Sequence, residues 1–139
     1  MRDYLFRGKR KDNGEWVEGY LVIADERYFI AKCPECITSL YYPDDIYSFT
    51  GFVEVIPETV GQYTGLTDKN GKGIFEGDIV KTDKFSEPNK QYIIKYDLLF
   101  GAFIGHDRYN FYFVTFDGDS DEFEVIGNIH DNPELMKGD

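Results

Sequence analysis

The chain of 139 residues has no apolar run of the roughly 18–20 residues that a membrane-spanning helix needs. It is also short of positive charge, because 15 lysines and arginines face 26 aspartates and glutamates, for a formal net charge of −11. Nucleic-acid binding by phosphate contacts requires a positive face, so this balance disfavours that class of protein. The first ten residues are charged and polar and lack the apolar stretch of a signal peptide, so we expect a cytoplasmic protein.

Cysteine is scarce, and the two that occur, Cys33 and Cys36, form one Cys-Pro-Glu-Cys motif. A closed zinc site needs four ligands, yet there is no second Cys pair, and His106 and His130 have no ligand spacing. The flanking residues look like strands rather than the helix start expected of a redox pair. The sequence therefore favours a hairpin turn that carries two thiols and no cofactor, with zinc at Cys33 and Cys36 or redox chemistry as the alternatives.

Catalytic signatures are missing as well. The sequence contains no Ser–His–Asp pattern and no glycine-rich phosphate loop that opens a helix. With 26 carboxylates, pairs of acidic residues arise by chance and do not identify an acid–base site. We therefore expect a protein that is not an enzyme.

What the chain does have is aromatic side chains, at 17% of its residues, which indicates a folded protein with a core. Short runs of aromatic and β-branched residues alternate with turn signals, and Tyr92, Ile94 and Tyr96 would share one strand face. Such spacing favours an all-β sandwich or small barrel of short antiparallel strands. Near the end, Asn132 and Pro133 predict one short helical turn that reaches Met136. The turn signals are Asp12–Gly14, Lys69–Gly71, Ser86–Asn89 and Asp117–Asp119.

A boundary is expected near residues 57–62, where Pro57 to Gly61 follow one strand and precede a turn-rich segment. It separates an N-terminal β subdomain, residues 1–60, from a C-terminal subdomain, residues 61–139. Each half is marginal in size for independent folding, so we expect the two to pack as one unit.

Two segments carry a recognisable pattern. Residues 61–81 contain Gln-Tyr-Thr-Gly-Leu, then Asp-Lys-Asn-Gly, then Glu-Gly-Asp-Ile-Val, and residues 124–135 contain Ile-Gly-Asn-Ile. With the start of the chain, residues 1–8, these blocks resemble the YopX family of small phage and prophage proteins, whereas residues 28–50 depart from its pattern. The resemblance implies a β-rich fold with an SH3-like barrel in the C-terminal subdomain, in a bacterial host cell. It transfers no biochemical activity.

The matched blocks also have a physical interpretation of their own. The glycines in them are placed at tight turns or close backbone approaches. Asp78 is expected to accept hydrogen bonds from backbone N–H groups at the turn that precedes its strand. This role explains the acidic residue at this position, and no bound ligand is needed to explain it.

A group of aromatic residues in a polar stretch suggests a binding surface for a protein partner, since such residues are favoured at interfaces. The alternative is that they fill the core of a small domain. The proposed contact residues are Tyr41, Tyr42, Tyr47 and Phe49, with Phe52 close by.

A different function follows from the basic residues at the N-terminus, which would contact phosphates locally in a nucleic-acid-associated β-barrel protein. We keep this as the alternative to a phage or prophage accessory protein that binds another protein. The basic cluster consists of Arg2, Arg7, Lys9, Arg10 and Lys11.

Overall fold

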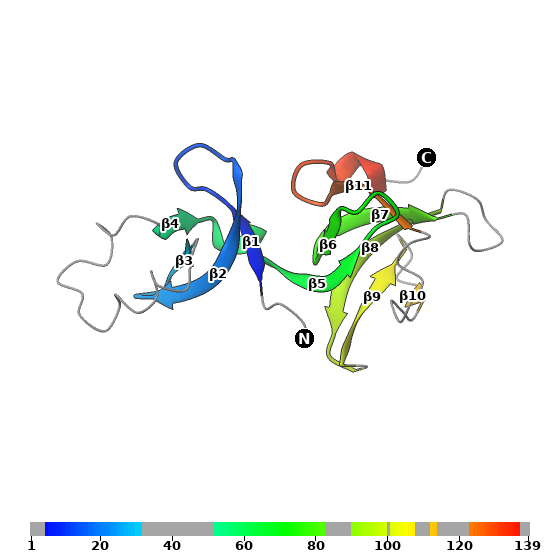
Figure 1. Cartoon of the computed structure of the whole chain (residues 1–139), viewed down its shortest axis with the longest axis horizontal. Coiled ribbons are helices and arrows are strands. Elements are labelled where there is room, and N and C mark those ends of the chain that lie inside the picture. Colours follow the sequence, from blue (N-terminus) through cyan, green and yellow to red (C-terminus); the bar gives the residue numbers. More distant parts are fainter. Residues whose placement is uncertain are drawn as a thin grey trace. The chain divides into compact units, whose positions relative to one another are not determined.

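A computed structural model describes residues 5–31, 52–82, 90–99, 101–107, 112–113 and 123–136. These residues form antiparallel strands and two short 3-10 helices, which confirms the all-β prediction. The chain divides into two compact units, unit 1 from Met1 to Gln62 and unit 2 from Tyr63 to Asp139. The division falls inside one strand, after Gln62, whereas the sequence predicts it after residue 60. Figure 1 shows unit 1 in blue to teal and most of unit 2 in green to red.

Unit 1 is built from four antiparallel strands in the order β4-β3-β2-β1. The turn at Asp12–Gly14 joins the first two strands, as the sequence predicts, and Gly14 has a φ of +74°. After β4 a 3-10 turn, η3, leads into β5, whose first residues Gly61 and Gln62 pair with β1. The elements are β1 (Phe6–Lys9), β2 (Trp16–Ala24), β3 (Arg27–Ala31), β4 (Phe52–Val55), η3 (Pro57–Thr59) and β5 (Gly61–Thr67).

The four strands close into a ring, because β4 also pairs with the continuation of β1. Arg10 forms a β-bridge with Val55, and the Lys11 N–H donates to the Glu54 carbonyl at 3.0 Å. The Ile56 N–H donates to the Lys9 carbonyl at 2.9 Å. β4 is therefore paired with β3 along its length and with the continuation of β1 at its end, from Glu54 to Ile56.

Gly19 permits β2 to change its partner strand. Gly19 pairs with Phe6 of β1, whereas the next residue, Tyr20, pairs with Ala31 of β3. A Cβ atom at Gly19 would lie 2.3 Å from the Ala31 carbonyl oxygen, which is closer than any real contact. The close approach of two backbones therefore requires glycine at this position.

Unit 2 contains a five-stranded antiparallel sheet in the order β10-β9-β8-β7-β11 and a hairpin of β5 and β6. Ile74 of the hairpin joins a buried cluster with residues of the sheet, and Val125 packs against this cluster. The elements are β6 (Gly73–Phe75), β7 (Asp78–Thr82), β8 (Lys90–Asp97), β9 (Ala102–His106), β10 (Tyr112–Phe113), β11 (Phe123–Asn128) and η5 (Pro133–Met136). The other members of the cluster are Val80, Tyr92, Ile94, Phe103 and Phe123.

Asp68 links the β5–β6 turn to the outer edge of β11. Its Oδ1 accepts the N–H groups of Asn70 at 2.8 Å and Lys72 at 2.9 Å, and its Oδ2 accepts that of Val125 at 2.9 Å. Burial alone would raise the pKa of Asp68, but these three donors outweigh it and hold the pKa below its ordinary value. The ionised carboxylate therefore satisfies N–H groups that the turn and the strand edge leave without a backbone acceptor.

Two further polar side chains act in the same way within the recognisable segments. The Oδ2 of Asp78, which is 1% exposed, accepts the Phe75 N–H at 2.8 Å, so its predicted turn role is confirmed. The Oδ1 of Asn128 accepts the N–H groups of His130 and Asp131 at 3.0 and 2.9 Å. The predicted helical turn at the end of the chain is present as η5.

We expect Asp68→Ala to destabilise unit 2 by about 1–2 kcal/mol, because three partly buried N–H groups lose the carboxylate that accepts them. The measurement is amide hydrogen exchange at Val125, whose protection should fall together with the free energy of unfolding. Glu134→Gln, on the exposed surface of η5, is the control and should leave protection unchanged. Unaltered protection of Val125 in Asp68→Ala would contradict the role of this carboxylate.

We expect Gly19→Ala to destabilise unit 1 by about 1–3 kcal/mol, because the added methyl group overpacks the contact with Ala31. Trp16 is the only tryptophan of the chain, so its fluorescence during chemical denaturation reports on unit 1. The exposed neighbour Glu18→Ala serves as the control. Equal midpoints for the two variants would refute the close approach.

Candidate functional site

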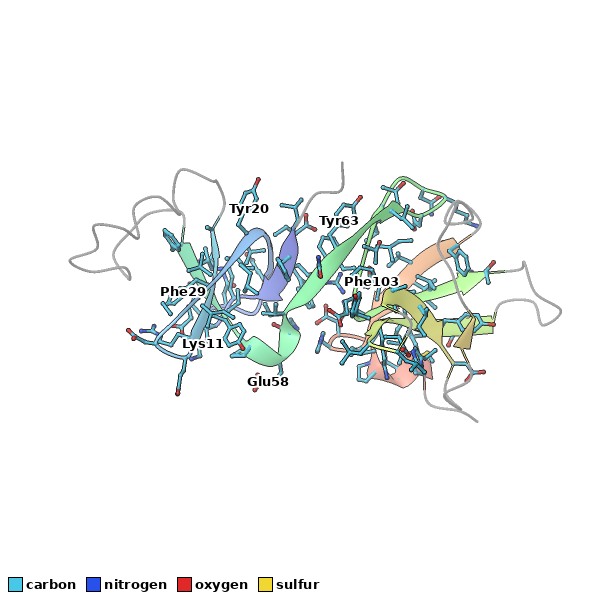
Figure 2. All side chains as sticks on the ribbon, turned by 90° about the horizontal axis from the view of Figure 1, so that it is seen from below. Lys11, Tyr20, Phe29, Glu58, Tyr63 and Phe103 are labelled. Atoms are coloured by element: carbon cyan, nitrogen blue, oxygen red, sulfur yellow. The ribbon has the colours of Figure 1, made fainter. Side chains whose placement is uncertain are left out.

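An open cleft of about 330 Å³ lies in unit 1, where the continuation of β1 meets β4. This volume is at the lower end of the range of ligand pockets, which suits one or two side chains better than a large cofactor. Figure 2 labels Lys11, which lines the cleft, and Phe29 on the neighbouring β3. The residues that line the cleft are Arg10, Lys11, Asp12, Phe52, Val53 and Glu54.

The apolar part of the cleft comes from Phe52 and Val53 at the start of β4, both of which are half-buried. In a strand these neighbours point to opposite faces, and Val53 shares its face with the fully buried Val55. Phe52 is on the face of Glu54, among the charged side chains. The charged face of the cleft therefore carries one large apolar side chain, that of Phe52.

Glu54 is the centre of a three-residue ion-pair network. Its carboxylate receives hydrogen bonds from Arg27 of β3, with Nε 2.9 Å from Oε2 and Nη2 on Oε1. Lys11 approaches from the other side, with Nζ 3.2 Å from Oε2. One carboxylate thus bridges the strands on both sides of β4, and the Arg27 guanidinium also lies 5.4 Å from the Phe29 ring centroid.

The electrostatic consequence is a strongly acidic carboxyl group. The hydrogen bonds from Arg27 lower the pKa of Glu54 most, burial opposes them, and the hydrogen bond from Lys11 adds a smaller decrease, so that the pKa falls from 4.5 to about 2. Asp12 is held in a similar way by Arg10, with Nε–Oδ1 at 2.9 Å and Nη2–Oδ2 at 2.8 Å. Its hydrogen bond with Arg10 lowers the pKa of Asp12 below its ordinary value.

These pairs give the cleft fixed charges rather than a group ready to transfer protons. A general base works best when its pKa is near the working pH, and the pKa of Glu54 lies far below neutrality. Among the residues that the structure describes, no group of three or more His, Cys, Asp or Glu side chains is arranged to hold a metal ion. The charged side chains of the cleft are therefore held in ion pairs.

The residues that the sequence analysis singled out for binding and metal ligation lie outside the described residues, in the segment between β3 and β4. The described residues that flank this segment, Ala31 and Phe52, are register partners. Of the five neighbouring aromatics, only Phe52 is described, and it lines the cleft. The undescribed candidates are Cys33, Cys36, Tyr41, Tyr42, Tyr47 and Phe49.

The predicted basic cluster is spread over several separate interactions. Arg7 is only 8% exposed and lies 4.7 Å from the centroid of the Trp16 ring, over which Lys9 also lies at 5.6 Å. Arg10 and Lys11 form ion pairs with Asp12 and Glu54. Of the described members of the cluster, Arg7 and Lys9 therefore lie over an aromatic ring, and Arg10 and Lys11 are paired with carboxylates, while Arg2 lies outside the described residues.

The two histidines do not line the cleft. His106 is on β9, where burial and the charge of Lys95 hold its pKa below the ordinary value. His130 follows β11, and its backbone N–H donates to the Oδ1 of Asn128.

Comparison with known proteins identifies the family. A family model described as YopX protein matches residues 5–137. The chain belongs to the YopX family. This result confirms the resemblance seen in the sequence blocks, whereas no curated protein matches the chain.

Two solved structures share the fold over nearly the whole chain. The crystal structure of protein EF1440 from Enterococcus faecalis is 24% identical, with a TM-score of 0.57, and covers 99% of this chain and 100% of its own. The crystal structure of protein yopX from Bacillus subtilis is 18% identical, with a TM-score of 0.51, and covers 100% of this chain and 99% of its own. At these identities the likeness shows the fold alone.

In the described ranges of the chain, no helix has the length and apolar character for a membrane crossing.

Sequence reasoning missed the cleft because its residues lie outside the blocks that carry the resemblance to the YopX family. One signal was present, since Glu54 interrupts an apolar run and the strand period places it opposite Val53 and Val55. The residues next to Glu54 in the sequence do not indicate that Lys11 and Arg27 are its ion-pair partners. Those contacts depend on the pairing of β4 with both neighbours.

We expect Glu54→Gln to flatten the acid dependence of the stability of unit 1. Because the folded-state pKa is depressed, the contribution of Glu54 is complete above about pH 4.5 and is lost as the pH falls toward 2. Denaturation followed by Trp16 fluorescence should show a smaller decrease over this window in the variant. The control is Glu18→Gln on the neighbouring strand β2, which should keep the wild-type profile, and a wild-type slope in Glu54→Gln would argue against the network.

Proposed function

We propose that this protein is a non-enzymatic phage or prophage accessory protein that binds another protein in the cytoplasm of the bacterial host. The observation that carries the proposal is the cleft at the β1–β4 seam, where the apolar side chain of Phe52 lies on the same strand face as Glu54 and its fixed ion pairs. Membership of the YopX family supports the phage or prophage setting.

The chemistry of the cleft supports binding to a protein segment. Apolar surface supplies the favourable free energy of association, while charged groups at the rim select the partner and its orientation. The rim is already organised before a ligand arrives, because Arg27 and Lys11 hold Glu54 and Arg10 holds Asp12. Organised side chains lose less conformational entropy on binding, which favours affinity.

The experiment is affinity capture of the tagged, intact protein from host lysate treated with nuclease, followed by titration calorimetry with the purified partner. We expect Phe52→Ala to weaken binding at least about tenfold, as loss of an apolar side chain at the centre of an interface does, and Lys11→Glu to weaken it by reversing a rim charge. Lys72→Glu makes the same change of charge on an exposed side chain that does not line the cleft, so it should bind like the wild type.

The outcomes separate the proposed function from its alternative. A discrete, nuclease-resistant protein partner whose binding depends on Phe52 and Lys11 supports the proposal. Partners that disappear on nuclease treatment would instead favour the nucleic-acid-associated function. A partner that binds all three variants equally would exclude the cleft as its binding site.

A further inference from the structure

The sequence contains two Asn-Gly pairs, Asn13-Gly14 and Asn70-Gly71, and both occupy exposed turns. Each glycine has a positive φ, +74° at Gly14 and +82° at Gly71, and a Cβ atom at either would meet nothing within 4 Å. In an Asn-Gly pair the glycine nitrogen can attack the asparagine side-chain amide and close a cyclic imide, because glycine has no Cβ to hinder the ring. Both turns therefore carry the sequence that deamidates most readily.

The two turns differ in how the asparagine side chain is held. The Oδ1 of Asn13 accepts the Glu15 N–H at 2.9 Å, which fixes this side chain. Within the described residues, no hydrogen bond restrains the side chain of Asn70, and only its backbone N–H donates, to the Oδ1 of Asp68 at 2.8 Å. The amide of Asn70 is therefore free to rotate toward the glycine nitrogen, whereas that of Asn13 must first break a hydrogen bond.

The other conditions for the reaction are matched between the two turns. The attacking nitrogen of Gly14 donates its N–H to the Arg10 carbonyl at 2.9 Å, and that of Gly71 donates to the Asp68 carbonyl at 3.0 Å. Each turn must therefore open locally before its glycine nitrogen can attack. Charges of both signs flank each turn, so charge does not separate the two sites. The freedom of the side chain decides between them.

We propose that the fold directs spontaneous deamidation to Asn70 in preference to Asn13, and that the isoaspartate formed at Asn70 releases its turn from β11. The Gly71 nitrogen loses its proton to solvent and bonds to the Cγ of Asn70, while the Cγ–Nδ2 bond breaks and Nδ2 takes up a proton and leaves as ammonia. Water then opens the cyclic imide. Hydrolysis at Cγ leaves aspartate in an ordinary main chain, whereas hydrolysis at the backbone carbonyl leaves isoaspartate, whose main chain is one methylene longer.

The longer main chain falls inside the hydrogen bonds that join this turn to β11. The Oδ1 of Asp68 accepts the N–H groups of Asn70 and Lys72, which lie on the two sides of the reacting bond. The Asp68 N–H also donates to the Lys72 carbonyl at 2.7 Å. An added methylene changes the spacing of these groups, so one carboxylate no longer fits both donors. The Oδ2 of Asp68 then loses the fixed position from which it accepts the Val125 N–H.

The first experiment stores the intact protein at mildly alkaline pH and maps deamidation by mass spectrometry after cleavage at glutamate. This cleavage gives the peptides 1–15 and 59–76, each of which contains one asparagine. Asn70 should deamidate at least about fivefold faster than Asn13, the factor that one hydrogen bond between neutral groups supplies. Equal rates, or faster reaction at Asn13, would overturn the proposal.

The matched control is the same protein stored unfolded in urea. The hydrogen bond between Asn13 and Glu15 is then absent, so the two asparagines should react at similar rates. A preference for Asn70 that is as large in urea as in the folded protein would show that the fold does not direct the reaction, and the proposal would be wrong.

Amide hydrogen exchange at Val125 tests the effect on the fold. Stored wild-type protein should lose protection in proportion to its isoaspartate content, whereas Asn70→Gln, whose longer side chain forms the cyclic imide poorly, should keep it. Freshly prepared Asn70→Asp carries the charge of the deamidated product on an ordinary main chain and should also keep protection. A loss in Asn70→Asp equal to that in the stored wild type would assign the effect to charge and contradict the release by isoaspartate.

Discussion

The carboxylate of Asp68 is the interaction on which the arrangement of unit 2 depends. It accepts N–H groups from Asn70 and Lys72 in its own turn and from Val125, 57 residues later in the chain. A buried N–H without an acceptor destabilises a fold, so this carboxylate fixes both the turn and the edge of β11. Asp78 and Asn128 serve nearby turns in the same way. All three belong to the blocks that carry the family resemblance, so folding accounts for these residues of the blocks.

Unit 1 protects its strand edges by closing a ring instead. β4 pairs with β3 on one side and with the continuation of β1 on the other, and Glu54 adds ion pairs in both directions. The cleft lies at this seam, so the contacts that close the ring also fix the charges around the candidate site. The same residues therefore close the ring and line the candidate site. Substitutions at exposed positions such as Lys11 are the ones that test the site.

The basic residues near the N-terminus show that a run of charge in the sequence does not by itself predict a charged surface. In the sequence, Arg7, Lys9, Arg10 and Lys11 form one positive run beside few acidic residues. In the structure, Arg7 and Lys9 lie over Trp16, while Arg10 and Lys11 pair with carboxylates. A strand directs successive side chains to opposite faces, so a continuous run of charge in sequence does not make a continuous charged surface.

The sequence by itself determined the all-β class, the turns at Asp12–Gly14 and Lys69–Gly71, and the last helical turn. These features depend on neighbouring residues, through positive φ at glycine, short polar side chains beside backbone N–H groups, and the strand period of two. Only the tertiary structure decided that β2 changes partner at Gly19, that β4 closes on β1, and that Glu54 meets Lys11 and Arg27. Those contacts join residues far apart in the chain, such as Lys11 and Glu54, which are 43 positions apart, and their formation depends on the packing of the whole unit rather than on local preference.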